Sequence, residues 1–163
     1  MSTLVAGSQL LSYRIHRVLN IPELRVVLTE AEHIPTGAKI LHLGSEDPEN
    51  VFCISFRTEP ETSNGVAHIL EHMVLCGSRQ YPVRDPFMSM TRRSLHTFLN
   101  ALTGADFTCY PGATLIPQDF QNLLDVYMDA VFQPLLREES FRQEGWRLEF
   151  EELENPRSPL TFR

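Results

Sequence analysis

The sequence predicts an α+β fold in which helices pack on one face of an antiparallel sheet. The first third of the chain carries short segments rich in Val, Ile and Leu that are separated by turn sequences, as expected for strands that pair in order. Further along, residues 117–134 place apolar side chains at three- and four-residue steps, the period of a helix packed on one face. The 163 residues, 42% hydrophobic and 21% charged, suffice for one globular domain.

Strands are predicted first along the chain. They cover residues 13–20, 24–29, 39–43 and 51–57. The turn sequence Ile34-Pro35-Thr36-Gly37 and the polar loop 45–50 separate neighbouring strands, so this part resembles an antiparallel meander. We interpret residues 1–12 as an N-terminal extension and residues 13–163 as one incomplete domain.

Helices dominate after residue 58. Ser63-Asn64-Gly65 is typical of a helix cap, residues 66–75 carry the helix, and Gly77 is its expected stop. The remaining predicted elements are a helix at 87–98, short strands at 100–103 and 107–110, a helix at 117–134, a charged helical segment at 138–152 and a strand starting at 160. The stripe on the 117–134 helix comprises Phe120, Leu123, Leu124, Tyr127, Met128 and Val131.

Charge and cysteine usage exclude several classes of protein. The chain has 14 basic and 21 acidic residues, a net charge of −7, and no basic stripe, so nucleic acid is not an expected partner. Its three cysteines lack C-x-x-C spacing, which predicts neither a disulfide framework nor a zinc ribbon. No apolar run approaches 18 residues, so we expect a soluble protein with no membrane partner.

The chemistry is expected in the segment His68-Ile69-Leu70-Glu71-His72. Two imidazoles four residues apart lie on one face of a helix, about 6 Å from each other, where one Zn²⁺ ion can bridge them. Glu71 lies close to the same face and is expected to act as general base. A zinc ion lowers the pKa of its water to roughly 7, so peptide hydrolysis is the natural reaction class.

A zinc site needs a third protein ligand, and the residues alone do not settle which it is. Cys76 lies eight residues beyond His68, about 12 Å along the helix axis, which is too far for one ion, so we interpret it as a packed thiol. The other candidates belong to the charged segment near the end of the chain, where a solvated face is the ordinary explanation. They are Glu144, Glu149, Glu151 and Glu152.

Three segments, in this order and spacing, carry a resemblance to a known family. They are HILEHMVLCGSRQYPVRDPF, LNALTGADFTCYP and QEGWRLEF. Together they resemble the presequence-protease branch of the pitrilysin, or insulinase-like, zinc metalloproteases. The resemblance implies that His68 and His72 are the histidine ligands and Glu71 the catalytic glutamate. It also implies a third ligand, a glutamate on a later helix, which we expect beyond Arg163.

The resemblance further implies how substrate binds. Members of the family have four related α/β domains that close around a chamber holding unfolded peptides, so the remaining domains of a longer protease are expected partners of this chain. Their substrate pairs as an added strand with a sheet edge beside the zinc helix. Residues 100–103 match that edge, and Asn100 and Ala101 among them are expected to bind substrate; the alternative is an ordinary strand with a satisfied Asn.

Three functions remain open at this point. The whole protein is expected to be a zinc endopeptidase that hydrolyses unstructured, presequence-like peptides. This chain by itself is expected to be inactive, a structural or peptide-binding module, because two histidines hold zinc weakly. A processing-peptidase-type subunit is the third option. Residues 1–12 contain no Arg, so we expect a bacterial cytoplasmic protein, with the mitochondrial matrix as the alternative.

Overall fold

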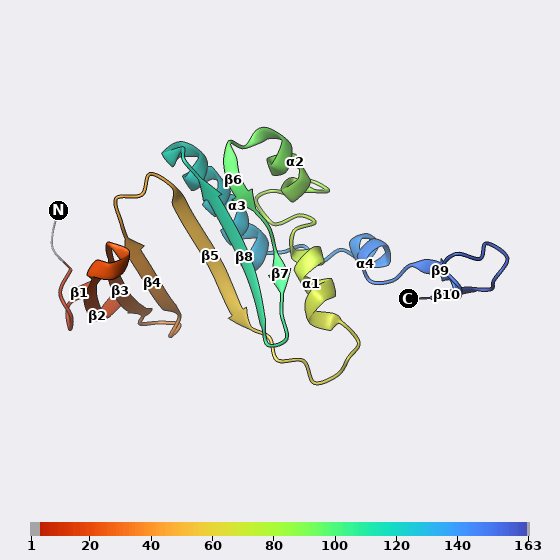
Figure 1. Ribbon diagram of the computed structural model, residues 1–163, viewed down its shortest axis with the longest axis horizontal. Helices are drawn as coiled ribbons and strands as arrows, with labels where there is room; N and C mark the ends of the chain where they lie inside the picture. Colours follow the sequence, from red (N-terminus) through yellow and green to blue (C-terminus); the bar gives the residue numbers. More distant parts are fainter. Residues whose placement is uncertain (1–3, 163) are drawn as a thin grey trace. The chain divides into compact units, whose positions relative to one another are not determined.

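The computed structural model describes residues 4–162 and confirms the α+β fold class (Figure 1). Antiparallel sheets and helices make up the described chain. The chain divides into two compact units, Met1–Pro48 and Glu49–Arg163, which are described separately below. Among the described residues, no helix is both long and apolar enough to cross a membrane.

The first unit is a four-stranded antiparallel sheet in the order β1-β2-β3-β4. Its strands are β1 (Gln9–Leu10), β2 (Tyr13–Ile21), β3 (Val26–His33) and β4 (Lys39–Gly44). The meander predicted for the first three long strands is confirmed. The second of them begins two residues later than predicted, because Pro22–Leu24 forms a short 3-10 turn that ends at Arg25 in the left-handed region, with φ of 55°.

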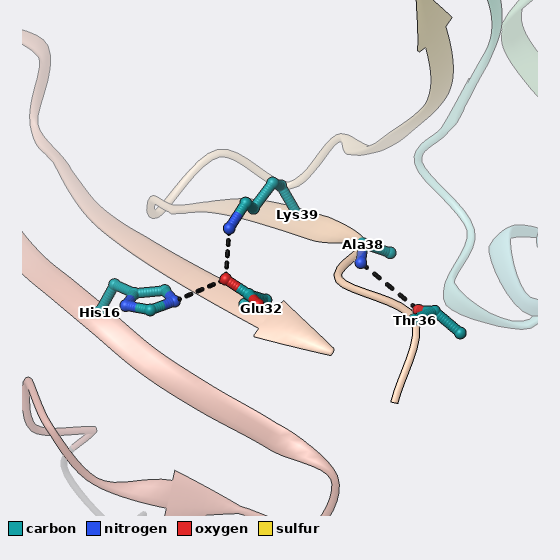
Figure 2. Close-up of polar contacts among 5 residues, drawn as sticks. All are labelled: His16, Glu32, Thr36, Ala38 and Lys39. Carbon is teal, nitrogen blue, oxygen red and sulfur yellow. Dashed lines mark hydrogen bonds and ion pairs between the residues drawn. The ribbon is translucent and has the colours of Figure 1, made fainter. Parts of the chain in front are cut away.

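One face of this sheet carries an exposed polar cluster, shown in Figure 2. Glu32 on β3 accepts a hydrogen bond from His16 Nε2 at 3.0 Å and a second one from Lys39 Nζ on β4. These bonds and the positive charge of Lys39 hold the pKa of Glu32 below its ordinary value, the Lys39 hydrogen bond contributing most. We call His16, Glu32 and Lys39 the surface cluster.

The second unit contains a sheet in the order β5-β8-β6, with β7 also paired to β8. Its strands are β5 (Asn50–Arg57), β6 (His96–Leu99), β7 (Leu102–Thr103) and β8 (Phe107–Thr114). The prediction that residues 51–57 continue the meander is wrong, because β5 pairs with β8 over its whole length. This pairing joins residues 50 to 64 positions apart, which local sequence does not reveal.

Helices of the second unit differ from the predicted ones mainly at their carboxyl ends. They are α1 (Val66–Val74), α2 (Pro86–Arg93), α3 (Pro117–Phe132) and α4 (Glu138–Glu144). The helix predicted to reach residue 98 ends at Arg93, because Ser94 is extended and His96–Leu99 joins the sheet. The helical segment predicted to reach residue 152 ends at Glu144.

A short hairpin follows α4. It consists of β9 (Leu148–Phe150) and β10 (Leu160–Phe162), which pair antiparallel, and the rings of Trp146 and Phe162 are in contact. The strand predicted to start at residue 160 is therefore present, and β9 is its partner. Arg163, the last residue of that predicted strand, lies outside the described residues.

The core of the second unit lies between the sheet and the helices α1 and α3. Val74 and Leu75 from α1 and its end meet Tyr110 of β8 and Tyr127 and Ala130 of α3, so both helices cover the same face of the sheet. Leu123 and Tyr127, predicted to face a core, are fully buried. Met128 was predicted on the same stripe but is exposed, because the buried stripe runs from Leu123 through Tyr127 to Ala130.

Candidate metal centre and active site

Local sequence explains why the predicted catalytic helix forms and where it stops. Gly65, in the left-handed region, precedes α1, and Met73 and Val74 anchor its last turn in the core. Gly77 turns the chain away with φ of 127°, and a Cβ there would lie 2.7 Å from the carbonyl oxygen of Val83. Only glycine fits that position, so α1 has a fixed end directly after its chemical residues.

The exposed side of α1 presents the two predicted ligands side by side. The Nε2 atoms of His68 and His72 lie 3.2 Å apart, and their rings meet edge to face with centroids separated by 4.9 Å. Both side chains line a pocket of about 520 Å³. The pocket walls come from α1, α2, α4 and the segment leading into β7.

This spacing fits two ligands of one zinc ion. Zinc bonds to imidazole nitrogen are about 2.0–2.1 Å long, so two nitrogens on a tetrahedral ion lie about 3.3 Å apart. The observed separation of 3.2 Å between the Nε2 atoms agrees with that value. The separation of the two Nε2 atoms is therefore compatible with both imidazoles binding one tetrahedral ion.

The other ring nitrogen of His72 is held from a distant helix. Its Nδ1 lies 3.0 Å from Oε2 of Glu144, which sits on α4 and lines the same pocket. When Nδ1 carries the proton and donates it to Glu144, the lone pair of Nε2 is left free to bind a metal. A carboxylate behind a histidine ligand is the usual means of fixing its ring and its tautomer.

Glu71 sits on the buried side of the pocket. Its side chain is only 6% exposed, and Oε2 accepts a hydrogen bond of 2.5 Å from Thr103 Oγ1 on β7. Its negative charge adds to the effect of burial in raising the pKa of Tyr110 to about 12. Tyr110 therefore stays neutral beside it. The carboxylate is thus held by a hydrogen bond, and it lines the same pocket as the two imidazoles.

The predicted substrate residues also line this pocket. The backbone N–H of Asn100 donates to the carbonyl oxygen of Pro111 at 3.2 Å, and its own carbonyl accepts from Tyr127 Oη at 3.2 Å. Its side-chain oxygen accepts from the Ala101 N–H at 3.0 Å. Among the described residues, nothing accepts a hydrogen bond from the side-chain Nδ2 of Asn100, so that donor is available to a ligand in the pocket.

Cys76 lines the pocket without taking part in the ligand set. Its thiol donates to the carbonyl oxygen of His72 at 3.4 Å. Burial, and then the negative charges of Glu144 and Asp85, raise its pKa, so the thiolate that binds metals is disfavoured. Within residues 4–162, no three His, Cys, Asp or Glu side chains are grouped so that they could hold a metal ion together.

Sequence reasoning missed two residues of this site. Glu144 was interpreted as part of a solvated face, but α4 places it against His72, so that interpretation is wrong. Thr103 was expected only as part of the edge strand, with no role for its side chain. Glu144 belongs to the segment QEGWRLEF and Thr103 to LNALTGADFTCYP, so both lie in the stretches that carried the family resemblance.

Comparisons with known proteins identify a matching family, related sequences and a similar fold. The family model described as "Insulinase (Peptidase family M16)" matches residues 53–159. The chain is 52% identical over 157 residues to the mitochondrial presequence protease of Mus musculus and 54% identical to that of Xenopus tropicalis. The Saccharomyces cerevisiae protein of the same name is 50% identical over 151 residues.

The aligned residues make up nearly all of this chain but only a small part of each relative. They cover 96%, 96% and 93% of this chain, respectively, but only 15% of each of these relatives. A crystal structure of pitrilysin matches with a TM-score of 0.70 at 20% identity, covering 82% of this chain and 15% of that one. The structural match shows a shared fold, and the sequence matches confirm the predicted resemblance to presequence proteases.

Proposed function

Because the chain belongs to the insulinase family of peptidases, family M16, we propose that it supplies the zinc-binding helix of an endopeptidase that cleaves unstructured peptides. The observation that carries this proposal is the 3.2 Å separation of the His68 and His72 Nε2 atoms beside the buried carboxylate of Glu71. His68 and His72 are the proposed zinc ligands and Glu71 the proposed general base.

A zinc ion, when bound, supplies Lewis acidity that polarises a peptide carbonyl and makes a water molecule acidic. The residues of the chain do the rest. Glu144 keeps the ring of His72 in place, and Glu71 accepts the proton of the attacking water and returns it to the leaving amine. Thr103 donates a hydrogen bond to Oε2 of Glu71, so Oε1 is the oxygen that accepts and returns the proton.

The proposed substrate site is the pocket edge formed by Asn100 and Ala101. Both residues lie directly before β7 and next to the pocket that contains the imidazoles. An extended peptide placed along this edge would present backbone groups to the pocket, and the Asn100 Nδ2 donor can bind one of its carbonyl oxygens. Such contacts favour unfolded peptides over folded proteins, because a folded substrate has no free strand to offer.

We propose that the third zinc ligand lies outside these 163 residues. This is supported by the lack of a three-residue ligand group within the described chain and by relatives about seven times longer than the matching region. A site with two imidazoles binds zinc weakly, so the 163 residues alone are proposed to be inactive and to serve as a structural or peptide-binding part of the protease. The remaining domains are its proposed partners.

A mitochondrial location is proposed in place of the bacterial cytoplasm. The relatives reported above are named mitochondrial. The matrix, where presequence-like peptides would be released, suits the proposed substrate. Protease protection of the endogenous protein in purified mitochondria, with and without the outer membrane opened, tests this location directly.

The central experiment compares wild type and Glu71→Gln in the longest chain that the gene encodes. Removing the general base should lower hydrolysis of a long unfolded peptide by on the order of a thousandfold, while zinc content stays the same. The 163-residue chain, assayed in parallel, should bind zinc weakly and show no turnover. Equal turnover by wild type and Glu71→Gln would refute the assignment of Glu71 as the general base. Turnover by the 163-residue chain would refute the proposal that the third zinc ligand lies outside it.

A further inference from the structure

Three threonine hydroxyls form a row that ends on the carboxylate of Glu71. Thr58 Oγ1 and Thr108 Oγ1 are 2.8 Å apart, Thr108 Oγ1 and Thr103 Oγ1 are 3.4 Å apart, and Thr103 Oγ1 lies 2.5 Å from Glu71 Oε2. The row crosses the sheet, because Thr58 directly follows β5, Thr108 is on β8 and Thr103 is on β7. Thr103 and Thr108 face each other as a cross-strand pair.

The direction of the hydrogen bonds in this row is fixed by proton count. An ionised carboxylate only accepts, so the single hydroxyl proton of Thr103 points to Glu71. Thr103 can then only accept from Thr108, and Thr108 can only accept from Thr58. Every hydroxyl therefore donates toward the carboxylate, and each bond polarises the next in these poorly solvated surroundings, where Thr108 is 4% exposed.

The second oxygen of Glu71 has no such partner. Among the described residues, no group hydrogen-bonds Oε1, although the residue lines the pocket. A carboxylate with one oxygen hydrogen-bonded and one free presents the free oxygen as the site for a further proton. The strand that ties it down, β7, also follows directly on Asn100 and Ala101.

We propose that Thr103, supported by Thr108 and Thr58, is a positioning residue that holds Oε2 of Glu71 and keeps Oε1 turned toward the reacting water. This inference rests on the proposed function and extends it. Asn100 and Ala101, proposed to bind the peptide, directly precede β7, whose Thr103 holds Glu71. The positions of the peptide and of the Glu71 carboxylate are therefore linked. A shift of about 1 Å in these positions can cost on the order of a hundredfold in rate.

The test compares Thr103→Val with Thr103→Ser in the longest natural chain. Valine keeps the shape and removes the hydroxyl, so kcat should fall about tenfold to a hundredfold while KM and zinc content stay unchanged. Serine keeps the hydroxyl and should restore most of kcat. Thr108→Val should lower kcat less than Thr103→Val, because it removes only the supporting bond. Thr36→Val, in the other unit, is the matched control and should leave kcat unchanged.

Crystal structures of the same variants give a readout independent of turnover. Glu71 should leave its wild-type orientation in Thr103→Val and keep it in Thr103→Ser. An unmoved Glu71 with unchanged kcat in Thr103→Val overturns the proposal. Loss of zinc or of thermal stability in both Thr103 variants overturns it too, since Thr103 would then only support the fold.

The two proposals can fail separately. Absence of zinc-dependent hydrolysis by wild type would remove the proposed function, and the orientation of Glu71 in the two crystal structures would still decide whether Thr103 holds it.

Discussion

Among the described residues, each unit contains a histidine–glutamate pair at the same distance, yet only the pair in the second unit belongs to a candidate metal centre. In the surface cluster, His16 Nε2 lies 3.0 Å from Glu32, and in the pocket His72 Nδ1 lies 3.0 Å from Glu144. Solvent exposure does not distinguish the two pairs, since the His16 side chain is 38% exposed and that of His72 is 47% exposed. What differs is the surroundings of each pair.

The carboxylate in the surface cluster is shared with a cation, whereas the carboxylate in the pocket supports a ligand. Glu32 also accepts from Lys39, so a positive charge already balances it (Figure 2). Glu144 leaves the remaining nitrogen of His72 facing a second imidazole. A histidine–carboxylate pair thus indicates a metal site only when its other nitrogen converges with a further donor.

The largest difference between the two pairs is expected in zinc affinity when the histidine of each pair is replaced. His72→Ala should weaken zinc binding by the longest natural chain by more than about a hundredfold, because it removes a direct ligand and even an outer-shell partner is worth 10–100-fold. His16→Ala should leave zinc affinity unchanged. Competition with a zinc chelator measures both. Equal losses in the two variants would show that the pocket pair has no special role.

A smaller effect is expected from the carboxylates. Glu144→Ala should weaken zinc binding by about tenfold, because the ring of His72 loses its support while both nitrogens of the ligand pair remain. Glu32→Ala is the matched control in the surface cluster. Isothermal titration with zinc distinguishes them, and a Glu144→Ala variant with wild-type affinity would contradict the role assigned to this residue.

The smallest effect concerns the surface cluster alone. Lys39→Met should raise the pKa of Glu32 toward its ordinary value of 4.5, because the largest cause of the lowered pKa is removed. A lowered folded-state pKa favours folding above the unfolded-state pKa, and that contribution is lost as pH falls through the folded-state pKa. The variant should therefore show a weaker acid dependence of unfolding below about pH 4.5. NMR titration of Glu32 in both proteins measures the shift, and an unchanged pKa would contradict the assigned cause.

Local sequence predicted the helix that presents His68 and His72 on one face, but not the residues that support it. The spacing of His68 and His72 places both on one helix face whatever the rest of the chain does, so a five-residue motif was enough to predict their convergence. Glu144 meets His72 only because α4 folds back onto α1, a contact between residues 72 positions apart. No local pattern encodes such a contact.

The same distinction explains the errors in the fold. Cap and stop residues predicted α1 and helical periodicity predicted α3, and both helices begin where predicted, although Met128 of the predicted stripe on α3 is exposed. The carboxyl ends of two predicted helices were wrong because residues 96–99 and 148–150 are recruited as strands by β8 and β10. Tertiary pairing overrode local propensity at both places.

Both imidazoles of the candidate centre come from a single helix of nine residues, which makes metal retention a property of that helix. An ion held by both rings would act as a clip across one helical turn and slow hydrogen exchange of the amides it spans. Opening of the same turn would release both rings in one event. Fraying of this segment would therefore leave the ion on its third ligand alone and favour its loss.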